Sequence, residues 1–205
     1  LVVQHRSDDK ATLWNLGIVT TALEDWSAAR QFWTALGFVI PETDGDFAAE
    51  GELTPVRLAT SDGPYEVLWG HRLCPARIRL KGIPLGSSWA GFDDDLLIDG
   101  VTTGQVEYDG KQMPVYTALR VVRPAGRKRY GLRTVGPVDS GRLEQLVQFM
   151  DYKGFAYADW RFLGTRTPYA VGLAPKSEEE LQTWMASIDE ADLSYGEWVY
   201  LDSTS

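Results

Sequence analysis

Two glutamates in otherwise apolar segments are the residues best suited to acid–base chemistry. Glu66 stands in the segment PYEVLW (residues 64–69), and Glu197 stands in GEWVY (residues 196–200). If both carboxylates face one cavity, burial and mutual repulsion raise their pKa values, and each is able to act as a general base. A carboxylate that alternates with apolar residues is more often on the solvent-exposed face of a strand, which is the alternative for both.

His71 is the candidate imidazole for such a site. It follows Glu66 by five residues and is one of only two histidines in the chain. An unperturbed imidazole titrates near neutral pH, which suits a general acid or base. A histidine in a surface loop is the alternative. The sequence therefore predicts Glu66, Glu197 and His71 as catalytic candidates.

Aromatic side chains and one arginine are the candidates for ligand contacts. The chain has eight Trp and nine Tyr, and Trp69 and Trp198 lie beside the two glutamates. Such rings line an aromatic pocket or form a protein interface. Arg129 belongs to a basic cluster that suits a phosphate, a carboxylate or an acidic protein surface, or else forms a solvated face. The cluster comprises Arg120, Arg123, Arg127, Lys128, Arg129 and Arg133.

No metal or cofactor site is expected. The acidic triplet 93–95 lacks the alternating ligands and terminal Glu of an EF-hand, which indicates a polar turn. The single cysteine, Cys74, excludes an internal disulfide and a zinc site of the paired-CxxC kind. The chain contains no GxGxxG, P-loop, GxSxG or HExxH motif.

Composition narrows the class of partner and the location. The 205 residues are 44% hydrophobic and 24% charged, which is ordinary for a globular protein. A net charge of −9 argues against nucleic acid, because the mean field repels phosphates. No apolar run approaches the ~18 residues of a membrane span, and no signal peptide is visible. With one cysteine, the cytoplasm is the expected location.

Hydrophobic periodicity predicts three helices. The first begins near Thr21 and ends at Gly37, and the second ends at Gly154. The third begins at a capping box formed by Ser177 and Glu180. Short β-branched or aromatic segments predict strands over most of the remaining chain, including residues 13–20. Together these elements predict an α+β protein.

The predicted elements form two modules joined by a β-rich insertion. Residues 1–70 form a βαβββ-like module, residues 71–128 form the insertion, and residues 129–205 form a ferredoxin-like module with the order β-α-β-β-α-β. A weak repeat relates GIVT (residues 17–20) to GLRT (residues 131–134), each followed by a helix and a Gly-Phe pair. Duplication and chance similarity are both compatible with this repeat.

Residues 12–70 resemble a module of the vicinal oxygen chelate superfamily, which includes glyoxalases, bleomycin-resistance proteins and extradiol dioxygenases. The resemblance rests on LGIV (residues 16–19) and ARQFWTALGF (residues 29–38). It implies two βαβββ modules that form a cup. In this family a first-strand His and a later-strand Glu from each module commonly hold a divalent metal, and the Glu positions fall on Glu66 and Glu197.

The first-strand positions implied by the resemblance fall on Asn15 and Arg129, and neither is histidine. Arginine is not a metal ligand, and asparagine is a weak one. The resemblance therefore favours the metal-free branches of the superfamily, which sequester small aromatic or glycopeptide-like ligands. In such a cup, Asn15 is a candidate for orienting the ligand.

Three functions follow as hypotheses. The leading one is a soluble protein that binds an apolar or aromatic small molecule, either to sequester it or as a metal-independent isomerase, cyclase or lyase. The second is a non-catalytic subunit of a larger assembly, such as a phage or organelle complex, with a protein partner or a homodimer contact. The third is a ligand-sensing regulatory domain, because the C-terminal element order resembles ferredoxin-like sensors of the ACT kind. No nucleic-acid or membrane partner is expected.

Overall fold

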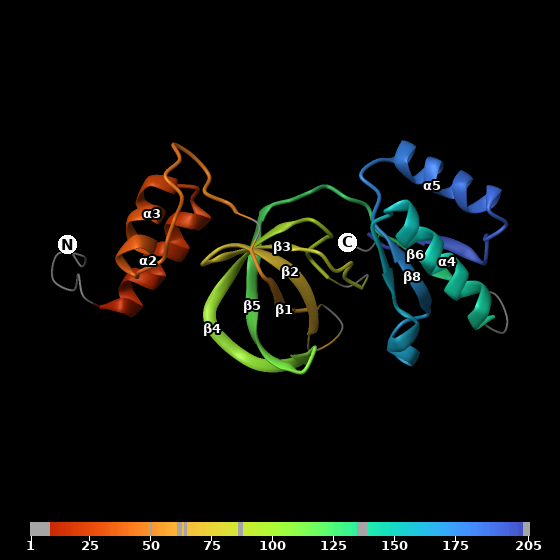
Figure 1. Ribbon diagram of the computed structural model, residues 1–205, viewed down its shortest axis with the longest axis horizontal. Coiled ribbons are helices and arrows are strands. Elements are labelled where there is room, and N and C mark those ends of the chain that lie inside the picture. The colour runs from red at the N-terminus through yellow and green to blue at the C-terminus, as the bar shows by residue number, and fades with distance from the viewer. Residues whose placement is uncertain are drawn as a thin grey trace. The chain divides into compact units, whose positions relative to one another are not determined.

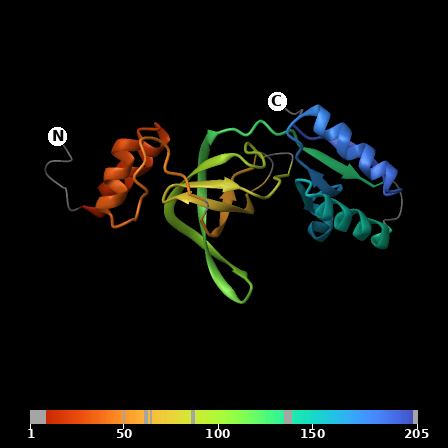
Figure 2. The ribbon, with the colours of Figure 1, turned by 45° about the horizontal axis from the view of Figure 1, so that its top comes forward.

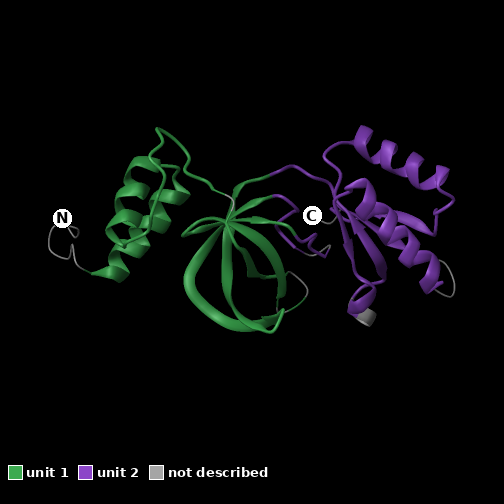
Figure 3. Ribbon diagram, viewed as in Figure 1, with its two compact units in different colours: residues 1–81, 94–124 green, residues 82–93, 125–205 purple. Residues whose placement is uncertain are grey.

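The computed structural model describes residues 9–49, 51–60, 63, 65–85, 88–134 and 139–202. The chain forms two compact units (Figure 3). Unit 1 contains residues 1–81 and 94–124, and unit 2 contains residues 82–93 and 125–205. Both units contain helices and mainly antiparallel strands (Figure 1), so the predicted α+β class is confirmed.

The boundaries of these units differ from the predicted module boundaries at residues 70 and 128. The strand β2 (Glu66–Cys74) runs through residue 70 without a break. The chain leaves unit 1 after Lys81, returns at Asp94 and leaves it again after Pro124. The segment 82–93 therefore belongs to unit 2, although both of its sequence neighbours belong to unit 1.

Unit 1 begins with a helical hairpin of α2 (Lys10–Ala22) and α3 (Trp26–Ala35). The side chain of Asp9 caps α2 by accepting a hydrogen bond from the backbone amide two residues on (3.0 Å). Asp25 caps α3 by accepting one from the amide three residues on (3.1 Å). Both helices thus begin at aspartates that satisfy exposed backbone donors.

The predicted strand over residues 13–20 is wrong, because this segment lies inside α2. Its β-branched residues favour a strand locally. The burial of Leu13, Gly17 and Thr21, which are spaced four apart on one helix face, outweighs that preference. Gly17 lets the Trp33 ring lie against the helix, since a Cβ there would be 2.7 Å from the ring. Unit 1 therefore lacks the first strand of the predicted βαβββ order.

Five strands follow and form a closed barrel. Each pairs antiparallel with the next, and the first and last close the barrel as a parallel pair. An odd number of strands in a meander makes this closing pair parallel. The strands are β1 (Leu53–Leu58), β2, β3 (Arg77–Leu80), β4 (Asp95–Tyr108) and β5 (Lys111–Arg123).

A tight turn connects the two longest strands, β4 and β5. Asp109 and Gly110 have φ values of 49° and 71°, as a type I′ hairpin turn requires. The residues on either side of this Asp-Gly pair, Tyr108 and Lys111, pair with each other and complete the hairpin. The part of the hairpin next to the turn is mostly exposed and extends beyond the other strands in Figure 2.

The helical hairpin and the barrel of unit 1 share one apolar core. Trp33, Ala29, Phe47, Ala76 and Leu97 are buried together in it. They come from α3, from the loop that follows α3 and from the barrel. The helices are thus part of the folded unit and not an independent arm.

Unit 2 has the predicted ferredoxin-like order. Its sheet runs β7-β8-β6-β9, with every neighbouring pair antiparallel. The helices α4 and α5 supply Leu143, Leu146, Met150, Trp184 and Ile188 to the core on one face of this sheet. The elements are β6 (Tyr130–Arg133), α4 (Ser140–Lys153), β7 (Tyr157–Asp159), η1 (Arg161–Arg166), β8 (Tyr169–Leu173), α5 (Glu178–Glu190) and β9 (Glu197–Tyr200).

The ends of these helices confirm two local predictions. Ser177 accepts a hydrogen bond from the Glu180 amide (3.1 Å) at the start of α5. Gly154 ends α4 in the left-handed region, with φ of 70°.

The second face of this sheet is covered by a smaller apolar cluster. Ile83 and Leu85, from the segment 82–93, pack there with Trp160 and Leu201. The Trp160 ring lies directly on Gly172, where a Cβ would be 2.6 Å from the ring. The segment 82–93 is therefore an integral layer of unit 2.

No helix among the described residues is both long and apolar enough to cross a bilayer.

We expect Gly172→Ala to destabilise unit 2, because Trp160 is buried and cannot move away from an added methyl group. Overpacking of this kind costs about 1–3 kcal/mol of unfolding free energy. The control is Gly141→Ala, since Gly141 is exposed in the first turn of α4 and its Cβ would meet only ordinary contacts. Urea unfolding followed by circular dichroism measures both. Equal stability of the two variants would contradict the packing of Trp160 on Gly172.

Candidate functional site

A pocket of about 410 Å³ opens in unit 1. Its walls come from the loop between α3 and β1, the beginning of β1, the end of β2 and the beginning of β5. The lining is mostly apolar and includes four prolines. The lining residues are Phe38, Val39, Ile40, Pro41, Phe47, Ala49, Gly51, Glu52, Thr54, Pro55, Arg72, Leu73, Cys74, Pro75, Met113, Pro114 and Tyr116.

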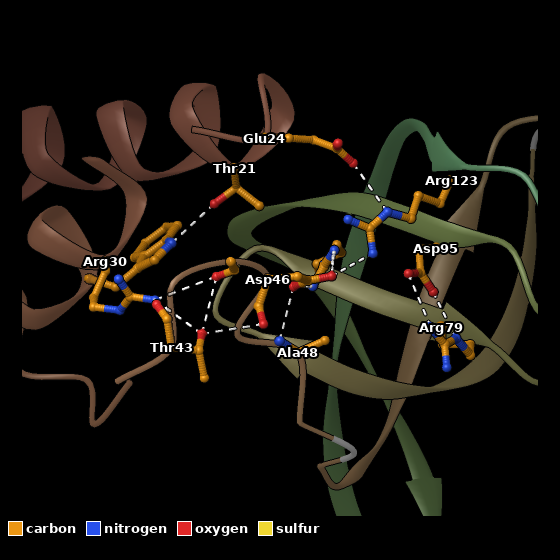
Figure 4. Close-up of polar contacts among 12 residues, drawn as sticks. Thr21, Glu24, Arg30, Thr43, Asp46, Ala48, Arg79, Asp95 and Arg123 are labelled. Atoms are coloured by element: carbon orange, nitrogen blue, oxygen red, sulfur yellow. Dashed lines mark hydrogen bonds and ion pairs between the residues drawn. The ribbon is translucent and has the colours of Figure 1, made fainter. Parts of the chain in front are cut away.

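The loop that forms one wall is held from the helical side by Arg30 of α3. Its Nε donates to the Pro41 carbonyl (3.2 Å), and its Nη2 donates to the backbone carbonyl of Thr43 (Figure 4). The guanidinium also lies over the Phe47 ring, 5.6 Å from its centroid. One side chain thus fixes three points of a loop that has no regular secondary structure.

The same loop is held from the barrel side by Asp46. Its carboxylate accepts hydrogen bonds from both Nη atoms of Arg77, one of them 3.0 Å long, and from Nη1 of Arg123. It also accepts one from the Ala48 amide (3.0 Å), which shapes the loop itself (Figure 4). Burial alone raises the pKa of Asp46, but the hydrogen bonds from the two arginines outweigh it and hold the pKa below its ordinary value.

The Arg77 side chain is fully buried, so its charge depends on this carboxylate. The Trp26 ring contributes a second, weaker contact, because the guanidinium of Arg77 lies 4.9 Å and that of Arg123 5.5 Å from its centroid. Arg123 also forms an ion pair (3.1 Å) with Glu24, which lies in the turn between α2 and α3. Helices, loop and barrel therefore meet at one charged network.

Five polar side chains line the pocket: Glu52, Thr54, Arg72, Cys74 and Tyr116. The guanidinium of Arg72 lies over the Tyr116 ring, 4.6 Å from its centroid, and its Nη2 donates to the Pro75 carbonyl (2.5 Å). Burial raises the pKa of the Cys74 thiol, which keeps it neutral. The hydroxyl of Thr54 donates to the Glu52 carbonyl (3.2 Å), while the Glu52 side chain is exposed.

Three of the residues predicted from the sequence lie on β2, but they do not line this pocket. Glu66 is the first residue of the strand and pairs with Leu58. The Trp69 ring contacts Tyr108, with the centroids 4.7 Å apart. His71 lies inside the strand and not in a loop, and its Nδ1 is 3.1 Å from the Gly51 carbonyl oxygen.

The remaining predicted residues are distributed over both units. Asn15 is exposed on α2, so the first-strand position implied by the family resemblance does not exist here. Glu197 is exposed on β9, and Trp198 packs against the core beneath the helices of unit 2. Glu66 and Glu197 belong to different units.

Arg129 is buried and holds unit 2 together. Its Nε and its backbone amide donate to the carboxylate of Asp202, the latter at 2.8 Å. Its Nη atoms donate to the carbonyls of Leu85 (2.9 Å) and Ser88 (3.2 Å). Arg129 thereby connects the segment 82–93 to Asp202, which follows the last strand, β9.

The basic cluster seen in the sequence divides among separate ion pairs and backbone contacts. Arg120 donates to the Ala22 carbonyl (3.2 Å) in unit 1. In unit 2, Arg127 pairs with Asp93 (2.7 Å) and Lys128 with Glu178 (3.6 Å).

The acidic triplet is also engaged in ion pairs. Asp93 binds Arg127, and Asp95 pairs with Arg79 (2.8 Å). Within the described ranges, no group of three or more His, Cys, Asp or Glu side chains has an arrangement that could hold a metal ion.

The pocket residues were missed by reasoning from the sequence because they follow no periodic pattern. The available signal was the set of prolines: Pro41, Pro55, Pro75 and Pro114. Proline cannot donate a ladder hydrogen bond, so it marks strand ends and irregular loops. It indicates where a wall is irregular but not that the walls converge.

Comparison with known proteins identifies no family. No protein-family model matches the chain, and no curated protein matches it. The crystal structure of a hypothetical protein from Neisseria gonorrhoeae is similar over 76% of this chain and 94% of that chain, with 11% sequence identity and a TM-score of 0.39. A similarity of this size shows neither a shared fold nor a shared function.

We expect Asp46→Asn to lower the unfolding free energy of unit 1 at pH 7 by about 3 kcal/mol, because it leaves a buried guanidinium without its counter-charge. The pKa of Asp46 is lower in the folded than in the unfolded state. The ion pair therefore stabilises the folded protein at pH values above 3.8, the ordinary pKa of this carboxyl, and the stabilisation is lost as the pH falls. Urea unfolding at pH 7 and at about pH 3 tests this. The difference between variant and wild type should shrink at the lower pH.

The matched control is Asp44→Asn, an exposed carboxylate in the same loop, which should leave stability nearly unchanged. A deficit of Asp46→Asn that is equal at both pH values would contradict the ion-pair assignment.

We expect Arg129→Gln to release the segment 82–93, because Gln cannot reach both carbonyls and Asp202 at once. The loss of a buried ion pair costs about 3–5 kcal/mol. Hydrogen–deuterium exchange of the peptide covering residues 82–93 should become faster. Arg133→Gln, which removes an exposed arginine stacked 5.7 Å from the Tyr169 centroid, is the control and should leave that peptide protected. If hydrogen–deuterium exchange of this peptide is unchanged in both variants, the structural role assigned to Arg129 is wrong.

Proposed function

We propose that the protein binds an apolar or aromatic small molecule in the pocket of unit 1. The observation that carries the proposal is the pocket itself, with a volume of about 410 Å³ and a mostly apolar lining. Ligand sites in proteins are typically concave, about 300–1,000 Å³ in volume, and lined by apolar side chains with a few fixed polar groups. This pocket has all three properties.

Preformed walls support the proposal. Arg30 and Asp46 fix the loop wall from two sides, and the other walls are strands of a closed barrel. A ligand that enters a preformed site does not have to order the protein, so less of its binding free energy is lost. The contacts that stabilise unit 1 therefore also favour ligand binding.

Binding is favoured over catalysis by the polar groups of the lining. The Cys74 thiol is neutral because burial raises its pKa, and a neutral thiol is a poor nucleophile. The Thr54 hydroxyl donates to a backbone carbonyl and not to a general base. We therefore propose sequestration or transport of the ligand as the role. The free, buried Cys74 is consistent with the expected reducing cytoplasm.

The test is a titration of the ¹⁵N-labelled full chain with neutral apolar compounds, 2-naphthol and 4-phenyl-1-butanol. We expect chemical-shift changes centred on the lining residues. Ala49→Trp should fill the pocket and weaken binding about tenfold or more, because the ligand loses apolar contact area. Ala49 is an exposed lining residue, so the larger side chain need not disturb the core.

The control is Ala59→Trp, since Ala59 is also exposed but does not line the pocket. This variant should bind both compounds as the wild type does. Absence of shifts at the lining residues, or equal binding by the two variants, would overturn the proposal.

A further inference from the structure

We infer that the preferred ligand is a carboxylic acid with an apolar body, and that Arg72 binds its carboxylate. This inference rests on the proposed function of the pocket and deepens it by naming the class of ligand. It is carried by the position and contacts of Arg72, which supplies the only cationic side chain of the lining.

Arg72 is held in place by two other lining residues. Its guanidinium stacks over Tyr116 at 4.6 Å, and its Nη2 donates to the Pro75 carbonyl at 2.5 Å. A guanidinium fixed in this way loses little rotamer freedom when it binds a ligand. The arrangement therefore favours a specific polar contact over a mobile surface charge.

The charge of Arg72 has no carboxylate partner in the part of the chain that the structure describes. The arginines nearest to it in sequence on the barrel do have one, since Arg77 pairs with Asp46 and Arg79 with Asp95. A guanidinium carries five N–H donors, and among the described residues the guanidinium of Arg72 donates one hydrogen bond. Donors at an apolar site favour an ionised acceptor, and a carboxylate matches the guanidinium in a bidentate geometry.

The Glu52 carboxylate is the negative charge among the lining residues, and it would repel an acidic ligand. Its side chain is exposed, so water and salt weaken that repulsion. Arg72 is half-buried, so water and salt weaken its charge less than that of Glu52. The balance therefore favours one negative charge on the ligand.

The number of cations indicates a carboxylate and not a phosphate ester. A phosphate group carries up to two charges and three acceptor oxygens, and it is usually held by several donors together. One arginine in a mostly apolar lining matches a monoanion attached to an apolar body. The volume of about 410 Å³ leaves room for that body beside Arg72.

The test compares acids with their neutral primary amides, which have nearly the same shape. Isothermal titration of the full chain with 2-naphthoate, 4-phenylbutyrate and the two corresponding amides is expected to show about tenfold or tighter binding of the acids, as a charge-assisted hydrogen bond requires. Raising the NaCl concentration should weaken binding of the acids and leave binding of the amides unchanged.

Arg72→Gln should remove the preference by weakening the acids to the level of the amides. Binding of the amides then reports that the variant is folded and that its pocket is intact. The matched control is Arg57→Gln, because Arg57 stacks on Tyr65 at 5.0 Å and donates to Thr117 (3.3 Å) on the same barrel but away from the pocket. That variant should keep the preference.

The outcomes separate the two proposals. Equal binding of acids and amides by the wild type, or a preference that survives Arg72→Gln, overturns the role of Arg72 and leaves the binding function standing. If the wild type binds neither the acids nor the neutral compounds, the binding function itself is overturned.

Discussion

The buried charge of Arg77 is the constraint on which the rest of unit 1 depends. A guanidinium without water is stable only beside a carboxylate that accepts its hydrogen bonds, and Asp46 takes this role. Because Asp46 stands in an irregular loop and Arg77 in a barrel strand, the ion pair decides where that loop lies. Arg123 then joins the same carboxylate to Glu24, so the helical hairpin is fixed by the same charge. Without this interaction, the apolar core around Trp33 and the contacts of Arg30 would still connect the three elements, but a buried charge would be left without its partner.

The pocket is a consequence of that arrangement and not an independent feature. One wall is the loop fixed by Asp46, and the others are parts of the barrel that would exist without it. Arg77 and Arg72 belong to the same hairpin but differ in how the protein satisfies their charges. Arg77 satisfies its charge inside the protein, whereas Arg72 satisfies only part of its hydrogen-bonding capacity there. The structural role of Arg77 and the ligand contact that we propose for Arg72 are thus only five residues apart in one hairpin.

The sequence predicted unit 2 better than unit 1, for physical reasons. The helices of unit 2 show regular apolar spacing and strong local end signals, such as the Ser177 cap and Gly154, so local rules are sufficient. The helix α2 was predicted as a strand because its β-branched run obeys the local rule, while the packing of Gly17 on Trp33 is tertiary. Arg129 was recognised as an important cation, but no local pattern distinguishes a ligand contact from an internal ion pair. The pocket could not be predicted, because it depends on three segments that meet only in the folded barrel.

The passage of the chain between the units has a consequence for synthesis on the ribosome. Once residue 124 has been made, every strand of the barrel exists, and unit 1 can close. The segment 82–93 is then already part of the chain, but the strands of unit 2 against which Ile83, Leu85 and Phe92 pack have still to be made. At about 5–20 residues per second, the last of these strands arrives roughly 4–15 s later. During this interval the segment connects two strands of a complete barrel, before the strands that will cover its apolar residues have been made.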